Sequence, residues 1–461
     1  MATLVLGKKN CTENPLKSSA PLGAALAFLG IDGAVPLFHG AQGCTAFALV
    51  LAVRHFKEAI PLQTTAMRET TVVLGGKENL EEALVNVVGR MKPRLVGVAS
   101  TALVETRGED IAGSLAAIVA DRRELDGTHV VFASTPDFEG ALEDGWAKAT
   151  SAILGSLVLA TPPVRNPGNV INVLPGVHET AGSIAMIKRM IEAFGLVARV
   201  VPDLSGSLDG HVPDSYVGTS LGGATVEDVA SMADAIHTLA IGEHMRAPAE
   251  VLSARTGVPH AVLPTLIGLE PADRFVRLLM DLSGRPAPAP IRRERSQLVD
   301  AMLDGHFHFS GKRVAIAADP DLLAAMVGLF SSMGAEVVVA VAATKNSPLL
   351  RTLPCPEVVV GDLADLETLA ERAGADWLVT HSHGRQAAER LQLPLFRVGF
   401  PIFDRLGHQH RALGGYTGTR ELVFELANQQ LERMHAPHPE SLHRPPPPSS
   451  PIVVESSHAG S

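Results

Sequence analysis

One cysteine of this chain stands in a setting that suits chemistry. Cys44 lies in the segment HGAQGCTA (39–46), shortly after an apolar run, and it is one of only 3 cysteines in 461 residues. The glycines near it let the backbone come close to a large group and direct N–H donors at it. A thiolate placed in this way could ligate a soft metal or an iron–sulfur cluster, or act as a nucleophile. A lone cysteine is more often a small buried apolar side chain, so the residues alone leave all three interpretations open.

The other candidate motifs favour structural roles. Residues 218–222 (GTSLG) match the G-x-S-x-G pattern of hydrolase nucleophiles, but no convincing strand precedes them, and Thr225 predicts an ordinary helix N-cap. Histidine pairs occur at 306/308, 381/383 and 408/410 without the spacing of a zinc site, so structural or interface roles are favoured. Cys355 stands between two prolines and is expected to be inert, whereas Cys11 gives no spacing signal.

Nucleotide-binding signatures are missing from the sequence. It contains neither G-x-G-x-x-G nor the G-x-x-x-x-G-K-S/T pattern, which are the commonest glycine motifs for holding nucleotide phosphates. A simple nucleotide-dependent dehydrogenase or kinase is therefore disfavoured.

The elements that position Cys44 follow a repeating order of strand, helix, glycine and strand. Residues 170–174 predict a strand, 179–194 a helix ending before Gly195, and 197–201 the next strand; the order returns at 314–317, 321–333 and 337–341. Further strands are predicted at 94–99, 129–133, 357–360, 377–380 and 395–398, and helices at 110–123 and 291–304. Apolar strands that alternate with helices indicate parallel sheets covered on both faces. The predicted fold class is α/β, with three Rossmann-like, doubly wound domains in series.

Shifts in composition mark the expected domain boundaries. A proline-rich linker at 161–168 and a bend at 284–290 separate an N-terminal domain (1–163, carrying Cys44), a second domain (164–290) and a third (291–435). The remainder, 436–461, is rich in Pro, Ser and His and is expected to be disordered.

Bulk composition excludes several classes of partner. A net charge of −10 with only 2 Trp and 2 Tyr supplies neither a basic stripe for phosphates nor an aromatic platform for bases, which argues against nucleic acid. No apolar run is long enough to cross a bilayer, and the start of the chain lacks a signal-peptide layout, so the cytoplasm is expected. The 46% hydrophobic content fits a chain that buries extra surface against a partner subunit.

Several motifs, taken in order along the chain, resemble one known family. They are NPLK (14–17), GAALAFLG (23–30), HGAQGCTAF (39–47), RHF (54–56), PLQTTAM (61–67), STPDF (134–138), PDLSGSLDGH (202–211) and GFP (399–401). Together they closely resemble the β-like subunits of the nitrogenase component 1 family, over nearly the whole chain apart from the tail. The early motifs are shared widely in that family. PDLSGSLDGH looks more particular to the scaffold subunits on which the iron–molybdenum cofactor of nitrogenase is assembled.

The resemblance implies a role for Cys44. The catalytic nitrogenase β subunit holds an eight-iron cluster with three cysteines, whose positions correspond here to Ser19, Cys44 and Ala102, so two of the three thiolates are missing. A [4Fe–4S] cluster normally takes four protein ligands. The resemblance therefore implies that Cys44 is the one metal- and cofactor-binding residue of this chain, as a ligand of a [4Fe–4S] cluster shared with the α-like partner NifE. His39 and His55 are expected to serve packing or hydrogen bonding.

The implied assembly is an α2β2 heterotetramer with NifE. On it, a precursor of the iron–molybdenum cofactor made by NifB would mature with molybdenum and homocitrate, assisted by the nitrogenase iron protein, before transfer to apo-nitrogenase. The precursor is expected mainly on the partner. This chain is accordingly expected to contribute a cluster ligand, the interface and a docking surface, with no catalytic residues and no self-contained active site.

Two other functions remain as alternatives. The first is an oxidoreductase subunit proper, either nitrogenase β or the related dark-operative protochlorophyllide reductase, which the missing thiolates at Ser19 and Ala102 disfavour. The second is a ligand-binding protein with tandem α/β domains and no cluster, which would contain no iron.

Overall fold

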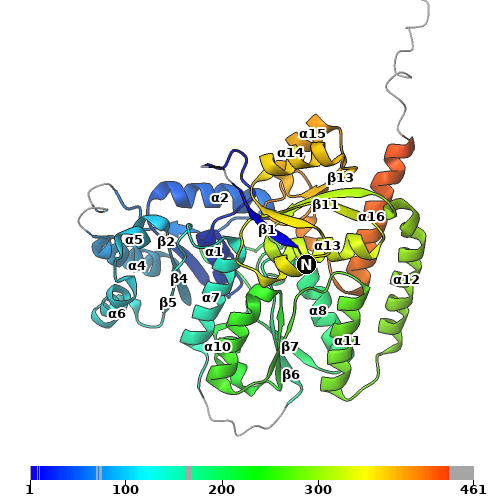
Figure 1. Cartoon of the computed structure of the whole chain (residues 1–461). Coiled ribbons are helices and arrows are strands. Elements are labelled where there is room, and N and C mark those ends of the chain that lie inside the picture. Colours follow the sequence, from blue (N-terminus) through cyan, green and yellow to red (C-terminus); the bar gives the residue numbers. More distant parts are fainter. Residues whose placement is uncertain are drawn as a thin grey trace, which may run out of the picture.

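Three parallel β-sheets with helices packed around them make up the molecule (Figure 1). The computed structural model describes residues 2–7, 9, 11–68, 71, 75–160 and 168–435. Within these ranges every pairing between named strands is parallel. The predicted fold class is confirmed. The predicted tail at 436–461, and all of the predicted linker except Gly168, lie outside the described residues.

The first sheet carries the segment around Cys44. Its strand order is β3-β2-β4-β5, with β2 (Ala34–His39), β3 (Gln63–Thr64), β4 (Leu95–Ser100) and β5 (His129–Ala133). The helices of this unit are α1 (Ala20–Leu29), α2 (Gln42–Phe56), α4 (Lys77–Met91), α5 (Ala102–Arg107), α6 (Ile111–Asp121) and α7 (Leu142–Leu157). Every residue of β2 and β4 is buried, as expected for central strands of a sheet covered on both faces.

The second sheet has the order β7-β6-β8-β9. Its strands are β6 (Val170–Leu174), β7 (Val197–Val200), β8 (His237–Ile241) and β9 (His260–Leu263), and its helices are α8 (Ala181–Ala193), α9 (Val226–Ala230), α10 (Arg246–Thr256) and α11 (Leu269–Ser283). The predicted strand at 170–174 is confirmed with the same bounds. The predicted helix at 179–194 begins two residues later, because Thr180 caps it by accepting a hydrogen bond from the Ser183 N–H at 3.0 Å.

The third sheet has the order β1-β12-β11-β10-β13-β14. Its strands are β1 (Thr3–Leu6), β10 (Arg313–Ala318), β11 (Glu336–Ala342), β12 (Glu357–Val360), β13 (Trp377–Thr380) and β14 (Leu395–Arg397), and its helices are α12 (Ala289–Phe309), α13 (Pro320–Ser332), α14 (Leu363–Ala373), α15 (Arg385–Leu391) and α16 (Gly415–His435). The start of the chain thus pairs with β12, in register from Thr3 with Glu357. Sequence patterns did not predict β1, because this edge strand is mostly exposed and shows no alternation.

Helices α1 and α7 approach each other unusually closely. A Cβ atom on Gly145 would overlap the carbonyl oxygen of Ala20, and one on Gly23 would overlap that of Leu142. The two glycines therefore let the backbones touch. This contact fixes the start of α1 against the start of α7. Ser19, the N-cap of α1, and Glu143, in the first turn of α7, both belong to the candidate sites described below.

Candidate functional site

Cys44 lies in the first turn of α2, directly beyond the end of β2. Ala41 is the N-cap, so Cys44 is the third residue of the helix, and its side chain is exposed. The N–H groups of a first helical turn have no partners within the helix and carry partial positive charge. A Cβ atom on Gly43 would meet nothing within 4 Å, which leaves open space beside the thiol.

The electrostatic setting of Cys44 suits a ligand better than a nucleophile. Protein atoms crowd one side of the thiol, and this partial burial, together with the nearby Asp137 carboxylate, raises the pKa of Cys44. The isolated chain therefore holds the protonated thiol at neutral pH. A thiolate would form there when a metal displaces the proton.

The family resemblance aligns Ser19, Cys44 and Ala102 with the three cluster-binding cysteines of the catalytic subunit. Each of these three residues lies at the start of a helix. Ser19 is the N-cap of α1, where its hydroxyl accepts a hydrogen bond from the Leu22 N–H at 3.4 Å. Ala102 is the first residue of α5, which follows β4. Since β2 and β4 are parallel neighbours, the starts of α2 and α5 lie at the same edge of the sheet. In this chain Ser19 serves as a helix cap, and Ala102 offers no ligand atom.

The loops after β2 and β4 are in direct contact at this edge. The Thr101 hydroxyl donates to the carbonyl of His39 at 3.1 Å. A Cβ atom on Gly40 would overlap the Thr101 side chain. Gly40 is thus required by packing within the chain, whereas Gly43 borders free space.

An apolar face of α2 lies exposed next to the cysteine. Phe47 is 69% exposed, and Val50 and Val53 are also exposed on the same helix. Phe138, which follows Asp137, is 62% exposed. Large apolar side chains gathered on a surface mark interaction sites.

His39, His55 and the serine of the GTSLG motif make hydrogen bonds within the chain. Nδ1 of His39 lies 3.1 Å from the Thr65 hydroxyl, and Nδ1 of His55 accepts a hydrogen bond from the Ile402 N–H at 2.9 Å. Ser220 of the GTSLG motif is buried, where it donates to the Ile31 carbonyl at 2.5 Å and accepts from the Ala34 N–H at 2.7 Å. Its hydroxyl is therefore occupied by the backbone and is not an exposed nucleophile.

The other two thiols differ in burial. Cys355 is buried, with Sγ 3.5 Å from the carbonyl of Glu357, whereas Cys11 is exposed.

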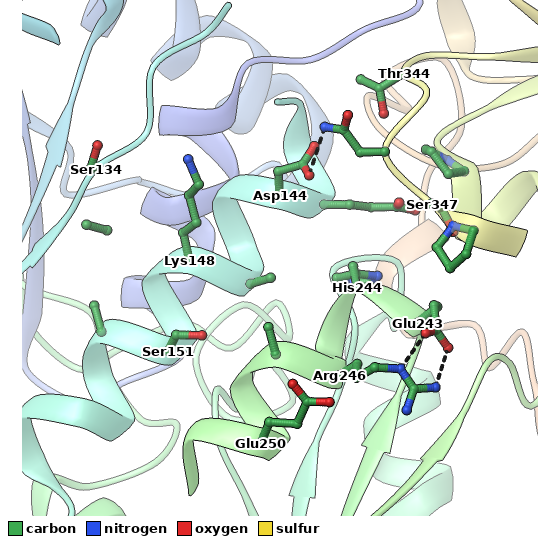
Figure 2. A pocket seen from close by; sticks show the side chains of 18 of the residues that line it. Ser134, Asp144, Lys148, Ser151, Glu243, His244, Arg246, Glu250, Thr344 and Ser347 are labelled. Atoms are coloured by element: carbon green, nitrogen blue, oxygen red, sulfur yellow. Dashed lines mark hydrogen bonds and ion pairs between the residues drawn. The ribbon is translucent and has the colours of Figure 1, made fainter. Parts of the chain in front are cut away.

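A cavity of about 700 Å³ opens between the three units. Figure 2 shows it bordered by α7, by the start of α10 and by the segment that follows β11. Its charged and polar lining includes Asp144, Lys148, His244, Arg246 and Ser347. Arg246 is paired with Glu243, at 2.5 and 2.9 Å.

A group of buried titratable side chains, which sequence reasoning missed, lies beside this cavity. It comprises Glu143, His178, His244, Asp319 and Asp321. Burial and the neighbouring Asp321 raise the pKa of Glu143 well above its ordinary value. Burial opposes charge on His244, but the attraction of Asp321 and Glu143 outweighs it and raises the pKa of His244 to about 9. The available signal was their position after the predicted strands, since 319 and 321 follow the strand at 314–317.

Comparison with known proteins gives the family. The model of the nitrogenase component 1 type oxidoreductases matches residues 19–431. The chain belongs to the nitrogenase component 1 family. Within it, the chain is 54% identical to the nitrogenase iron-molybdenum cofactor biosynthesis protein NifN of Mesorhizobium japonicum over 435 residues, which cover 94% of each chain. It is 38% identical to the NifN protein of Klebsiella pneumoniae, again over 94% of each chain.

A solved nitrogenase structure shows the same fold. It is described as nitrogenase Cp1 at pH 6.5 and superposes with a TM-score of 0.88 at 30% identity, covering 95% of this chain and 97% of that one. Among the described residues, none of the helices combines the length and apolar character that a bilayer crossing requires.

Proposed function

We propose that this chain is the β-like subunit of a cytoplasmic α2β2 scaffold with NifE, on which the precursor of the iron–molybdenum cofactor matures before transfer to apo-nitrogenase. The observation that carries the proposal is the exposed Cys44 at a sheet edge where Ser19 caps a helix and Ala102 offers no ligand atom. The names of the NifN relatives support it, since they denote cofactor biosynthesis proteins. Ser19, Cys44 and Ala102 together do not supply a complete set of ligands for an eight-iron cluster.

The residues around Cys44 fit a cluster that is shared with a second chain. A [4Fe–4S] cluster takes four protein ligands, and this edge of the sheet offers one thiol. Cys44 would hold one iron atom, and NifE would supply the other three ligands. The open space beside Gly43 allows a bulky group to approach the N–H donors of the first turn of α2, which have no partner within the helix. Such donors tune a cluster through hydrogen bonds to its sulfurs.

The exposed face of α2 fits the interface that sharing requires. Phe47, Val50 and Val53 extend along the helix that begins beside Cys44. A partner that covers them would bury apolar surface and place its own ligands next to the thiol. In this assembly the cluster would relay electrons from the nitrogenase iron protein. The NifB-derived precursor would be bound mainly by NifE.

A catalytic oxidoreductase subunit is the second candidate, and the structural likeness to nitrogenase Cp1 favours it. Ser19 and Ala102 count against it, because they provide no thiolate at positions where the catalytic subunit is expected to have cysteines. The two candidates differ in what the complex does. A scaffold would bind precursor and transfer it, whereas a nitrogenase component would reduce dinitrogen.

The test is co-purification of the chain with NifE, followed by iron analysis and paramagnetic resonance of the reduced complex. We expect an α2β2 complex with iron and a [4Fe–4S] signal, but without efficient dinitrogen reduction. Efficient dinitrogen reduction would favour the catalytic candidate. A complex without iron and without a signal would instead indicate a ligand-binding protein that has no cluster.

A further inference from the structure

Five polar side chains from three units meet where their strands end. Glu143 is in the first turn of α7, His178 follows β6, and His244 is in the short turn Glu243–Met245 after β8. Asp319 and Asp321 follow β10, at the start of α13. Their side chains are only 5–11% exposed. In α/β folds this is the end of the sheet where ligands bind.

These side chains approach within hydrogen-bonding distance of one another. Oδ2 of Asp321 lies 2.7 Å from Nδ1 of His244, and Oε1 of Glu143 accepts a hydrogen bond from the Asp321 N–H at 3.0 Å. Nε2 of His178 lies 3.1 Å from Oε1 of Glu143 and 3.4 Å from Oδ2 of Asp319. The group therefore forms one connected centre with three carboxylates and two imidazoles.

Three of these residues have the spacing of ligands around one metal ion. One ligand atom each from Glu143, His244 and Asp321 lies within 4.8 Å of the other two. Donor atoms around a first-row metal ion stand at most about 4.4 Å apart, twice a bond of about 2.2 Å. Closure by a few tenths of an ångström would bring the three atoms into one coordination sphere.

Asp319 supplies independent evidence that the centre suits a cation. Its side chain is 7% exposed, and its Oδ1 atom is buried with no hydrogen-bond partner among the described residues. A buried carboxylate oxygen without a partner is costly, and buried charges are usually paired or bound to metals. The carboxylates also outnumber the imidazoles, so a divalent cation would balance the excess negative charge.

The cavity of about 700 Å³ gives this centre a route to solvent. Glu143 and His244 both line it, and Figure 2 shows His244 and Ser347 beside the open space. The Ser347 hydroxyl donates to Oδ1 of Asp321 at 3.1 Å. Only three protein ligands would bind the ion, so the remaining coordination positions could face the cavity.

We propose that Glu143, His244 and Asp321 bind one divalent first-row transition-metal ion, separate from any site at Cys44. His178 positions Glu143, and Asp319 adds negative charge at the rim of the site. Imidazole together with carboxylates suits manganese, iron or zinc rather than calcium or magnesium. Since each ligand comes from a different unit, the ion would also fasten the three units together around the cavity.

The test uses Mn²⁺ as the probe, because this ion has little affinity for the thiols elsewhere in the chain. The full chain, in its complex with NifE if that is how it purifies, is titrated with Mn²⁺. Loss of the paramagnetic signal of the free ion reports binding. We expect one tight site per chain. Glu143→Gln and Asp321→Asn should abolish it, and His178→Gln should weaken it about 10- to 100-fold.

Two matched controls separate this site from other interpretations. Asp209→Asn changes a carboxylate whose Oδ1 lies 2.6 Å from Nδ1 of His211 at the surface. This substitution should leave Mn²⁺ binding unchanged. Cys44→Ala should also leave it unchanged, so the outcome does not depend on the proposed function. Absence of a tight site in the unmodified chain, or a site that survives Asp321→Asn, would overturn the proposal. If a variant fails to fold, the unmodified chain tests the proposal. The measurements are then its Mn²⁺ titration and the rise in its melting temperature when Mn²⁺ is added.

Discussion

Oδ2 of Asp321 lies 2.7 Å from Nδ1 of His244, although the residues stand 77 positions apart, His244 after β8 of the second sheet and Asp321 after β10 of the third. The same oxygen accepts a hydrogen bond from the His244 backbone N–H at 2.9 Å. The Asp321 N–H in turn donates to Glu143 of the first unit at 3.0 Å. One buried residue, Asp321, thus joins the three units, through its side chain to His244 and through its backbone N–H to Glu143.

The close contact of α1 with α7 gives a first prediction. Gly145→Ala should lower the free energy of unfolding by about 3 kcal/mol or more, because the new methyl group overlaps the Ala20 carbonyl and the backbones cannot separate without opening the core. Chemical denaturation measures the change. Gly155→Ala on the same helix is the matched control, since its Cβ would meet nothing within 4 Å. It should be neutral or stabilise by up to about 1 kcal/mol. Equal effects of the two changes would refute the packing argument.

The buried His408 gives a prediction about pH. Burial, with a smaller effect of Arg411, lowers the pKa of His408 to about 4. Between pH 6.5 and 4 the unfolded chain therefore binds a proton that the folded chain does not, so stability falls as the pH falls through this range. From pH 7 to pH 5 the unmodified chain should lose about 2 kcal/mol more than His408→Gln. Urea denaturation at the two pH values measures this, and parallel losses in both proteins would contradict it.

The apolar face of α2 gives a prediction about assembly. Phe47→Lys should weaken association with NifE at least about tenfold, because a buried aromatic anchor would be replaced by a charge that must be desolvated. The dissociation constant of the complex is the measurement. Val119→Lys, which changes a 42% exposed side chain on α6, serves as the control and should leave association intact. Loss of association in both variants would point to general surface effects instead.

The regular parts of the fold could be predicted because their patterns are local. Strands such as β6 and β13 are apolar runs bounded by turn residues, and both have the predicted bounds. The strand β1 could not be found in this way. It is an edge strand with exposed side chains, and it exists because the start of the chain lies against β12. Its formation depends on a contact over about 350 residues of sequence, as the pairing of Thr3 with Glu357 shows.

The candidate site was predictable only in part. Cys44 could be singled out by its glycines and by the family resemblance. The structure places it exposed at a helix start, and its role as a ligand stays a prediction. The exposed apolar face of α2 was not predicted, because the helix is apolar on both faces in sequence. The centre around Asp321 was missed since its members come from three units and share no spacing. Only the arrangement of the sheets brings them together.

Iron content of the complex with NifE tests the central claim most directly. Cys44→Ala should lower iron content and weaken the [4Fe–4S] paramagnetic signal of the reduced complex, because a shared cluster loses one of its four ligands. Cys355→Ala, which changes a buried thiol in the third unit, should leave both unchanged. Equal iron content and identical spectra in the unmodified complex and both variants would contradict the assignment of Cys44 as a cluster ligand.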